Sequence, residues 1–191
     1  MKEKLRQALS AREKGRIINP QRIPAAVILP FYEKQNQYHI LFTKRTANVK
    51  NHRGQISFPG GAYQEGDSSL LDTALRECCE EIGLSPDQIE ILGELDDTPT
   101  FTSNYIITPF AGLLRCPFTL KVNRYEIAEI IEAPVPALLD TNNLRYGTEV
   151  VDNQTITAYY YSYQGKVIWG ATARILHQFL SIFAQVLERT S

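Results

Sequence analysis

Residues 58–84 read FPGGAYQEGDSSLLDTALRECCEEIGL, and the rest of the chain is organised around this stretch. It begins with a proline and two glycines and continues through a short polar loop. From Leu71 to Ile82 apolar side chains recur at three- and four-residue steps, which is the pattern of a helix with one buried face. Gly83 follows directly, and glycine commonly ends a helix. The stretch therefore predicts a glycine-rich loop followed by a helix over residues 68–82.

Three glutamates lie near the end of this predicted helix. Glu77 and Glu81 are four residues apart and Glu80 is three from Glu77, so the three share one face. Their charges repel, and the helix dipole disfavours negative charge near a C-terminus, so a bound cation would be stabilising. Oxygen ligands of this kind suit Mg²⁺ or Mn²⁺. A solvated acidic face is the plainer interpretation, but Gly60 and Gly61 favour a ligand site because glycine lets backbone approach a ligand.

The combination resembles the signature of the Nudix hydrolases, which runs G, five residues, E, seven residues, then REUXEEXGU, where U is aliphatic. Gly61 takes the first position, and residues 76–84 take the second half, with Cys78 at the first aliphatic position. The early acid is Asp67 instead of glutamate, and eight residues separate it from Arg76. The resemblance implies an α/β fold, a Nudix-like α/β/α sandwich with a mixed β-sheet. The order of predicted strands and helices also favours an α/β domain with helices on both faces.

The same resemblance implies a role for each residue of the box. Glu77, Glu80 and Glu81 would be metal ligands or would activate water, and Arg76 would orient those carboxylates. The implied reaction is the metal-dependent hydrolysis of a diphosphate, in which Mg²⁺ or Mn²⁺ neutralises phosphate oxygens and lowers the pKa of a bound water.

The segment before the box, residues 44–57, carries basic side chains and no acid. Its basic residues are Lys44, Arg45, Lys50, His52 and Arg53. A basic loop beside a carboxylate cluster suits a polyphosphate, because the metal and the basic groups can hold different oxygens. A solvated loop is the alternative. The residues expected to contact the substrate are Arg45, Lys50, Arg53, Gly60 and Gly61.

Residues 41–61 also resemble an additional motif of the coenzyme A diphosphatase subgroup, LLTXR(S/A), three residues, R, three residues, G, three residues, FPGG. Phe42 replaces the second leucine, Thr46 replaces serine or alanine, and Lys50 replaces arginine. The change at Lys50 keeps the charge but loses bidentate hydrogen bonding. The resemblance implies coenzyme A or acyl-CoA as the small-molecule substrate, with 4′-phosphopantetheine and adenosine 3′,5′-bisphosphate as products.

Two other functions remain open at this point. A Nudix hydrolase could act on another nucleoside diphosphate derivative, such as NADH or ADP-ribose, or on a nucleoside triphosphate. A module with the same fold could instead bind a nucleotide without catalysis, although such a module has no need of three clustered acids.

The composition of the whole chain bounds its organisation. We expect a single domain over residues 1–191, with a helical extension at residues 1–20 and the box at residues 58–84. The formal net charge of −1 predicts no general affinity for nucleic acid or membrane. No apolar run approaches about 18 residues and no signal-peptide pattern occurs, which favours a cytoplasmic protein. The three cysteines, two of them adjacent, indicate neither a disulfide framework nor a zinc site.

Further strands and helices are expected on both sides of the box. Strands are predicted at residues 25–29, 38–43, 89–95, 105–114, 126–131, 148–151 and 155–163, and further helices at residues 1–16 and 171–187. The acids in residues 126–131 are expected to face solvent, with a further metal ligand or a base as the alternative. The tyrosines in residues 159–163 are expected to pack on the strand, with a wall for adenine as the alternative.

Overall fold

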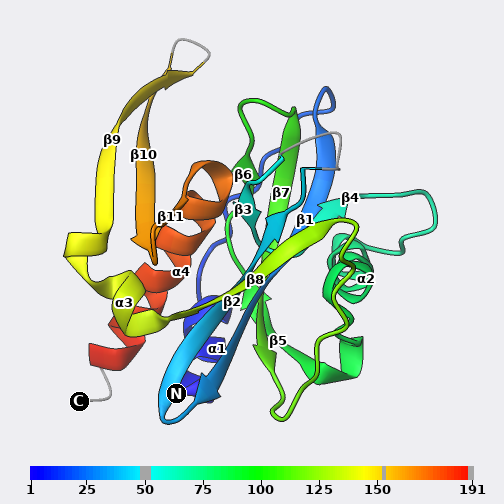
Figure 1. Cartoon of the computed structure of the whole chain (residues 1–191). Helices are drawn as coiled ribbons and strands as arrows, with labels where there is room; N and C mark the ends of the chain where they lie inside the picture. Colours follow the sequence, from blue (N-terminus) through cyan, green and yellow to red (C-terminus); the bar gives the residue numbers. More distant parts are fainter. Residues whose placement is uncertain (48–52, 152–153, 189–191) are drawn as a thin grey trace.

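Strand β1 lies at the centre of the fold (Figure 1). The structure is a computed structural model, and it describes residues 1–47, 53–151 and 154–188. In β1 (Ile23–Lys34) eight consecutive residues, 25–32, are buried, as expected for a strand covered on both faces. It pairs in parallel with β7 (Tyr105–Leu114) and antiparallel with β2 (Gln37–Arg45), so the sheet is mixed.

The large sheet has the order β3-β2-β1-β7-β5, and three more strands pair beside this path. On the path, β3 spans Ile56–Ser57 and β5 spans Ile89–Glu94. The three strands beside it are β4 (Gly60–Ala62) on β1, β6 (Thr98–Pro99) on β7, and β8 (Ile127–Pro134) on β2. Antiparallel strands β9 (Leu144–Val151), β10 (Gln154–Tyr163) and β11 (Lys166–Ile168) form a smaller sheet. The β9–β10 hairpin extends away from the rest of the chain in Figure 1.

Alternate residues of β1 belong to two separate cores. Ala26 and Ile28 pack with α2 (Leu70–Ile82), whereas Val27 and Leu29 pack with α1 (Lys2–Ser10) and α4 (Gly170–Glu188). This follows from the two-residue period of a strand, which sends successive side chains to opposite faces. Helices therefore cover both faces of the mixed sheet, and the predicted α/β architecture is confirmed.

The N-terminal helix is shorter than the predicted span of residues 1–16. It ends at Ser10, and Leu5 and Leu9 are fully buried in the core shared with α4. The chain that follows is held by ion pairs instead of helical turns, with Arg12 on Asp96 at 2.6 Å. In residues 11–16, ion pairs with residues far along the chain therefore outweigh the local tendency to form a helix.

The first predicted strand, residues 25–29, is too short because it stops directly before Pro30. In the structure β1 passes through Pro30, and its pairing with β2 begins only at the next residue, Phe31. A proline lacks the N–H that such a ladder uses, so it is tolerated before the pairing starts. The connection from β1 to β2 is a tight turn in which Gln35 and Asn36 have φ values of 52° and 61°.

The remaining strand predictions agree with the structure in position, within a few residues at each end. The short strands β3, β4, β6 and β11 had no periodic signal, because two or three residues show no alternation. A short helix, α3 (Val135–Leu139), follows β8. None of the helices in the described ranges combines the length and apolarity needed to cross a membrane.

Candidate active site

Helix α2 is defined by local signals at both ends. The Ser69 side chain accepts a hydrogen bond from the Asp72 N–H, so the helix begins at Leu70, two residues after the predicted start. Gly83 adopts a left-handed conformation, with φ 73°, and ends the helix as predicted. The buried stripe includes Ala74 and Cys78, so the glutamates are presented toward β4 and the neighbouring loop.

Glu81 is the most buried acid of the site, at 2% exposure. Its Oε1 accepts a hydrogen bond from Arg45 Nη1 at 2.9 Å, and its Oε2 accepts one from the Gly60 N–H at 3.3 Å. Burial raises the pKa of Glu81 to about 7, and the Arg45 guanidinium opposes this rise. The side chain is therefore fixed in position by two groups that precede α2 in the chain.

Glu77 lies directly against Gly61. A Cβ atom at Gly61 would lie 2.5 Å from Glu77 Cδ and 2.7 Å from each carboxylate oxygen. The Glu77 Oε1 accepts a hydrogen bond from Arg76 Nη1 at 2.6 Å. Burial raises the pKa of Glu77, with Arg76 opposing the rise. The second glycine of the pair thus provides the space that this carboxylate occupies.

Arg76 connects the polar loop with two of the glutamates. Its Nε and Nη2 donate to the two oxygens of Asp67 at 2.9 and 3.0 Å, which is a bidentate ion pair. Its Nη1 donates to Glu77 and, at 3.3 Å, to Glu80, whose side chain is 58% exposed. The pair with Arg76 holds the pKa of Asp67 well below its usual range. Asp67, despite its irregular spacing from the rest of the box, anchors the arginine that contacts Glu77 and Glu80.

Asp67→Asn is expected to lower the melting temperature at pH 7, because an amide cannot form the bidentate ion pair with Arg76. The pKa of Asp67 is depressed in the folded state, so its stabilisation is present above the unfolded pKa of about 3.9. This stabilisation is lost as the pH falls through the folded value. The difference in melting temperature from the wild type should therefore be largest near neutral pH and shrink below about pH 4.

Thermal unfolding of both proteins at pH 7 and pH 3 checks this expectation. Glu65→Gln is the matched control, since Glu65 is an exposed acid in the same loop. Equal melting temperatures of wild type and Asp67→Asn at pH 7 would contradict the anchoring role.

A fourth glutamate, Glu126, joins the site from the segment before β8. Its Oε2 lies 3.8 Å from Arg45 Nη2, and its charge contributes to the raised pKa of both Glu77 and Glu81. Glu126 lines the cavity with a side chain that is 37% exposed, so it fits the alternative of an acid that faces the site. Only the acid–apolar alternation pointed to it, and that pattern is equally typical of a solvated edge.

The residues expected to contact the substrate are only partly brought together. Arg45, Gly60 and Gly61 line one cavity with Glu77 and Glu81. Arg53 is not among the residues that line it, and Lys50 lies outside the described residues. His52 of the basic loop also lies outside them.

The carboxylates suit a divalent cation in their chemistry. In the structure, Arg45 pairs with Glu81 and Arg76 pairs with Glu77. Within the described ranges, no three His, Cys, Asp or Glu side chains are grouped closely enough to enclose a metal ion. Their oxygens are nevertheless hard ligands, which Mg²⁺ and Mn²⁺ prefer. Burial and mutual repulsion raise the pKa of Glu77 and Glu81, and a cation would reverse both effects. The residues present therefore fit such an ion.

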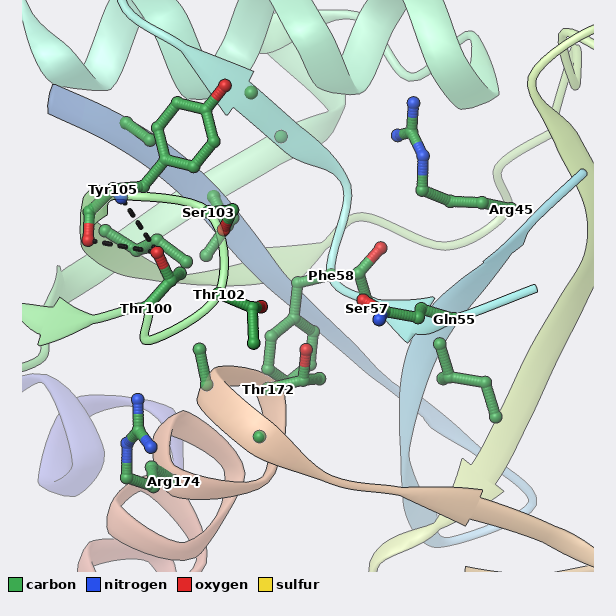
Figure 2. Close-up of a pocket in the computed structure, with 18 of the residues that line it drawn as sticks. Arg45, Gln55, Ser57, Phe58, Thr100, Thr102, Ser103, Tyr105, Thr172 and Arg174 are labelled. Carbon is green, nitrogen blue, oxygen red and sulfur yellow. Dashed lines mark hydrogen bonds between the residues drawn. The ribbon is translucent and has the colours of Figure 1, made fainter. Parts of the chain in front are cut away.

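The cavity extends well beyond the acids and has a volume of about 390 Å³. Its other walls come from the loop of residues 100–105 and from the start of α4. Figure 2 shows Arg45 and Arg174 on opposite sides of this space, with Phe58 and Thr172 between them. A volume of this size accommodates part of a nucleotide-sized ligand.

The tyrosines of β10 do not contribute to this cavity. Tyr161 is buried in the core at 2% exposure, and its hydroxyl lies 2.8 Å from His177 Nδ1. Tyr159 stacks on the His177 ring with centroids 3.9 Å apart. These contacts favour packing as their role, rather than a wall for adenine.

The chain is similar in sequence to one known protein family and to two curated proteins named below. A family model described as "NUDIX domain" matches residues 21–130. A protein of Photorhabdus laumondii named "Uncharacterized Nudix hydrolase NudL" is 37% identical over 154 residues, which is 81% of each chain. A protein of the same name from Pectobacterium atrosepticum is 34% identical over 159 residues, covering 83% of this chain and 81% of its own.

Solved structures with similar folds include a C. elegans Ap4A hydrolase binary complex, at a TM-score of 0.55 and 14% identity over 87% of this chain and 98% of that one. A MutT/nudix family protein from Enterococcus faecalis aligns at a TM-score of 0.58 and 14% identity, over 94% of this chain and 66% of that one. At such low identity these likenesses concern the fold alone, and they confirm the predicted fold class.

Proposed function

The chain belongs to the NUDIX domain family, and we propose that within it this protein hydrolyses the diphosphate of coenzyme A or acyl-CoA, with Mg²⁺ or Mn²⁺ as cofactor. It is a Nudix hydrolase, an enzyme that cleaves the phosphoanhydride of a nucleoside diphosphate derivative. The products we propose are 4′-phosphopantetheine and adenosine 3′,5′-bisphosphate.

The ion pair between Arg45 and Glu81 carries the proposal for coenzyme A. Arg45 belongs to the motif that resembles the coenzyme A diphosphatase subgroup, and Glu81 belongs to the box. The two residues lie 36 positions apart in the chain, and their side chains meet at 2.9 Å within the cavity. This contact supports the idea that the two motifs act on one substrate.

The side chains of the site have separate tasks in the proposed reaction. Glu77, Glu80 and Glu81 would hold the metal ion, which when bound neutralises phosphate oxygens and lowers the pKa of a water ligand. Arg76 orients Glu77 and Glu80 through its Nη1, and Arg45 with the Gly60 N–H orients Glu81. In the proposed step the water oxygen bonds to one phosphorus, the bond from that phosphorus to the bridging oxygen breaks, and two phosphomonoesters are released, with the protons of the water passing to these phosphates or to solvent.

Turnover of coenzyme A by the purified protein tests this proposal. We expect both products by chromatography with Mg²⁺ or Mn²⁺ present, and no turnover after a chelator removes the ion. NADH, ADP-ribose and nucleoside triphosphates serve as competing substrates in the same assay. A kcat/KM for ADP-ribose or NADH well above that for coenzyme A would assign the protein to another nucleoside diphosphate derivative. If none of these substrates is turned over, the protein would instead be a module that binds a nucleotide without catalysis.

We also propose that residues 1–191 act as one domain, with residues 1–20 as an extension and residues 58–84 as the catalytic loop and helix. The burial of Leu5 and Leu9 in the same core as β1 and α4 supports this organisation.

A further inference from the structure

We propose that the end of the cavity formed by Arg174 and the start of α4 binds a phosphate group that the substrate carries outside its diphosphate. In coenzyme A this group is the 3′-phosphate of the adenosine. The inference rests on the proposed function and adds Arg174 to the residues that would bind the substrate. Arg174 lies almost a hundred positions beyond Glu77, outside both sequence motifs.

Arg174 is a half-buried cation without a carboxylate partner among the residues that the structure describes. Its Nη2 donates to the Pro99 carbonyl, and its Cζ lies 4.4 Å from the centroid of the Phe101 ring. These two contacts hold the guanidinium in place and leave most of its N–H donors available. Burial lowers the pKa of Arg174, with the more distant charge of Glu149 opposing the effect.

The other arginine that lines the cavity differs in this respect. Arg45 lies 2.9 Å from an oxygen of Glu81 and 3.8 Å from one of Glu126, so acids of the site already balance its charge. Arg174 forms no ion pair with an acid among the described residues, although Glu149 also lines the cavity and its charge acts on Arg174, and a charge without a close partner is costly away from water. An anion that enters the cavity would therefore gain more from Arg174 than from Arg45.

Two further features of this end of the cavity favour an anion. Residues 170–172 line the cavity and form the first turn of α4, where backbone N–H groups lack acceptors within the helix and the dipole is positive. In the loop that carries Phe101, the Ser103 Oγ is buried and has no hydrogen-bond partner among the described residues. A phosphate has enough oxygens to accept from the guanidinium, the helix start and this hydroxyl together.

The chemistry of coenzyme A identifies which half belongs at this end. The pantetheine half beyond the diphosphate carries amides and a thiol but no anion, whereas the nucleotide half carries the 3′-phosphate and a purine. Phe101 and Trp169, which is 45% exposed, line the same end and offer aromatic surface to the purine. The nucleotide half therefore matches the Arg174 end.

Binding of adenosine 3′,5′-bisphosphate and of AMP, compared by calorimetry, tests the inference without turnover. The two ligands differ only in the 3′-phosphate. We expect the wild type to bind the bisphosphate about tenfold or more tightly than AMP, and Arg174→Gln to lose this preference, because one charge-assisted hydrogen bond is worth about that factor. Arg115→Gln is the matched control, since Arg115 is exposed and does not line the cavity, and it should keep the preference.

Kinetics give a second measurement. Arg174→Gln should raise KM for coenzyme A by about tenfold or more, and should change KM for dephospho-CoA, which lacks the 3′-phosphate, by less than about twofold. Arg174→Lys, which retains the charge, should recover part of the affinity for the bisphosphate. Melting temperatures of all variants report whether loss of the Pro99 contact has altered the fold.

Each outcome decides between the inference and its rivals. Equal losses for both ligands, or for both substrates, would mean that Arg174 only holds the loop around Phe101, and would overturn the inference. An unchanged preference in Arg174→Gln would overturn it as well, and a loss of preference in Arg53→Gln instead would return the phosphate to the basic loop. If the wild type hydrolyses neither coenzyme A nor dephospho-CoA, the proposed function fails, while the calorimetry still decides whether Arg174 recognises the phosphate.

Discussion

Glu81→Gln is expected to lower kcat by about 10²–10³-fold, the effect of removing one electrostatic group from a preorganised site. Glutamine keeps the size of the side chain and an oxygen that can accept from the Gly60 N–H, but it removes the charge that would bind the metal ion. Glu81 is the most buried acid of the site, so solvent cannot take over its role. The fold should survive, because the buried stripe of α2 is unchanged.

Steady-state kinetics at saturating metal, together with thermal unfolding, measure this effect. Glu129→Gln is the matched control, because Glu129 lies on β8 and pairs with Lys166 at 3.0 Å outside the cavity. It should retain nearly full kcat. Near-normal turnover in Glu81→Gln at saturating metal would exclude this residue as a metal ligand or water activator.

Substitutions at the two glycines should have large but different effects. At Gly61 a Cβ atom would meet the carboxylate of Glu77, which is the end of a flexible side chain and can move. Gly61→Val should therefore displace Glu77 and lower kcat by about 10²-fold or more, since a shift near 1 Å in a catalytic group can cost that factor. The substitution should leave most of the stability intact.

At Gly60 the obstruction is backbone, which cannot move aside. A Cβ atom there would lie 2.3 Å from the Ala26 carbonyl oxygen and 2.6 Å from Val27 Cα, both in β1, and φ is +154°. Gly60→Ala should therefore reduce stability, with strain alone contributing about 1–3 kcal/mol.

Chemical denaturation and kcat, measured on both variants, separate the two effects. Gly147→Ala is the control, because Gly147 has no atom within 4 Å of the added Cβ atom. A fully active and equally stable Gly61→Val enzyme would refute the requirement for glycine beside Glu77. A Gly60→Ala protein as stable as the wild type would refute the requirement at Gly60.

The parts of the site that could be read from the sequence are those whose partners are close in the chain. The end of α2, the shared face of Glu77 and Glu81, and the glycines before the helix depend on spacings of a few residues. Helical geometry fixes such neighbours whatever the rest of the chain does. The spacing from Asp67 to Arg76 differs from the family pattern, so its anchoring ion pair was not predicted, although it too is local.

Other features depended on contacts that no local pattern encodes. The ends of the first helix and first strand were misjudged because tertiary pairing overrode local propensity at residues 11–16 and at Pro30. Glu126 joins Arg45 because β8 pairs with β2 across more than eighty residues of chain. The acid–apolar alternation around Glu126 suits an exposed edge and a catalytic site equally well.

The sequence by itself determined the family box, the α/β class and the acidic helix face, because each is carried by periodicity or by spacing within one segment. Only the tertiary structure decided that Arg45 balances Glu81 and that Arg174 reaches the same cavity without an ion pair to any acid in the described part of the chain. The pairing of β1 with β7 and the packing of α4 bring segments together that are far apart in the chain. Such contacts form because apolar side chains from distant segments are buried together on the two faces of β1. Burial of this kind depends on how all these segments pack, and no short stretch of sequence encodes it.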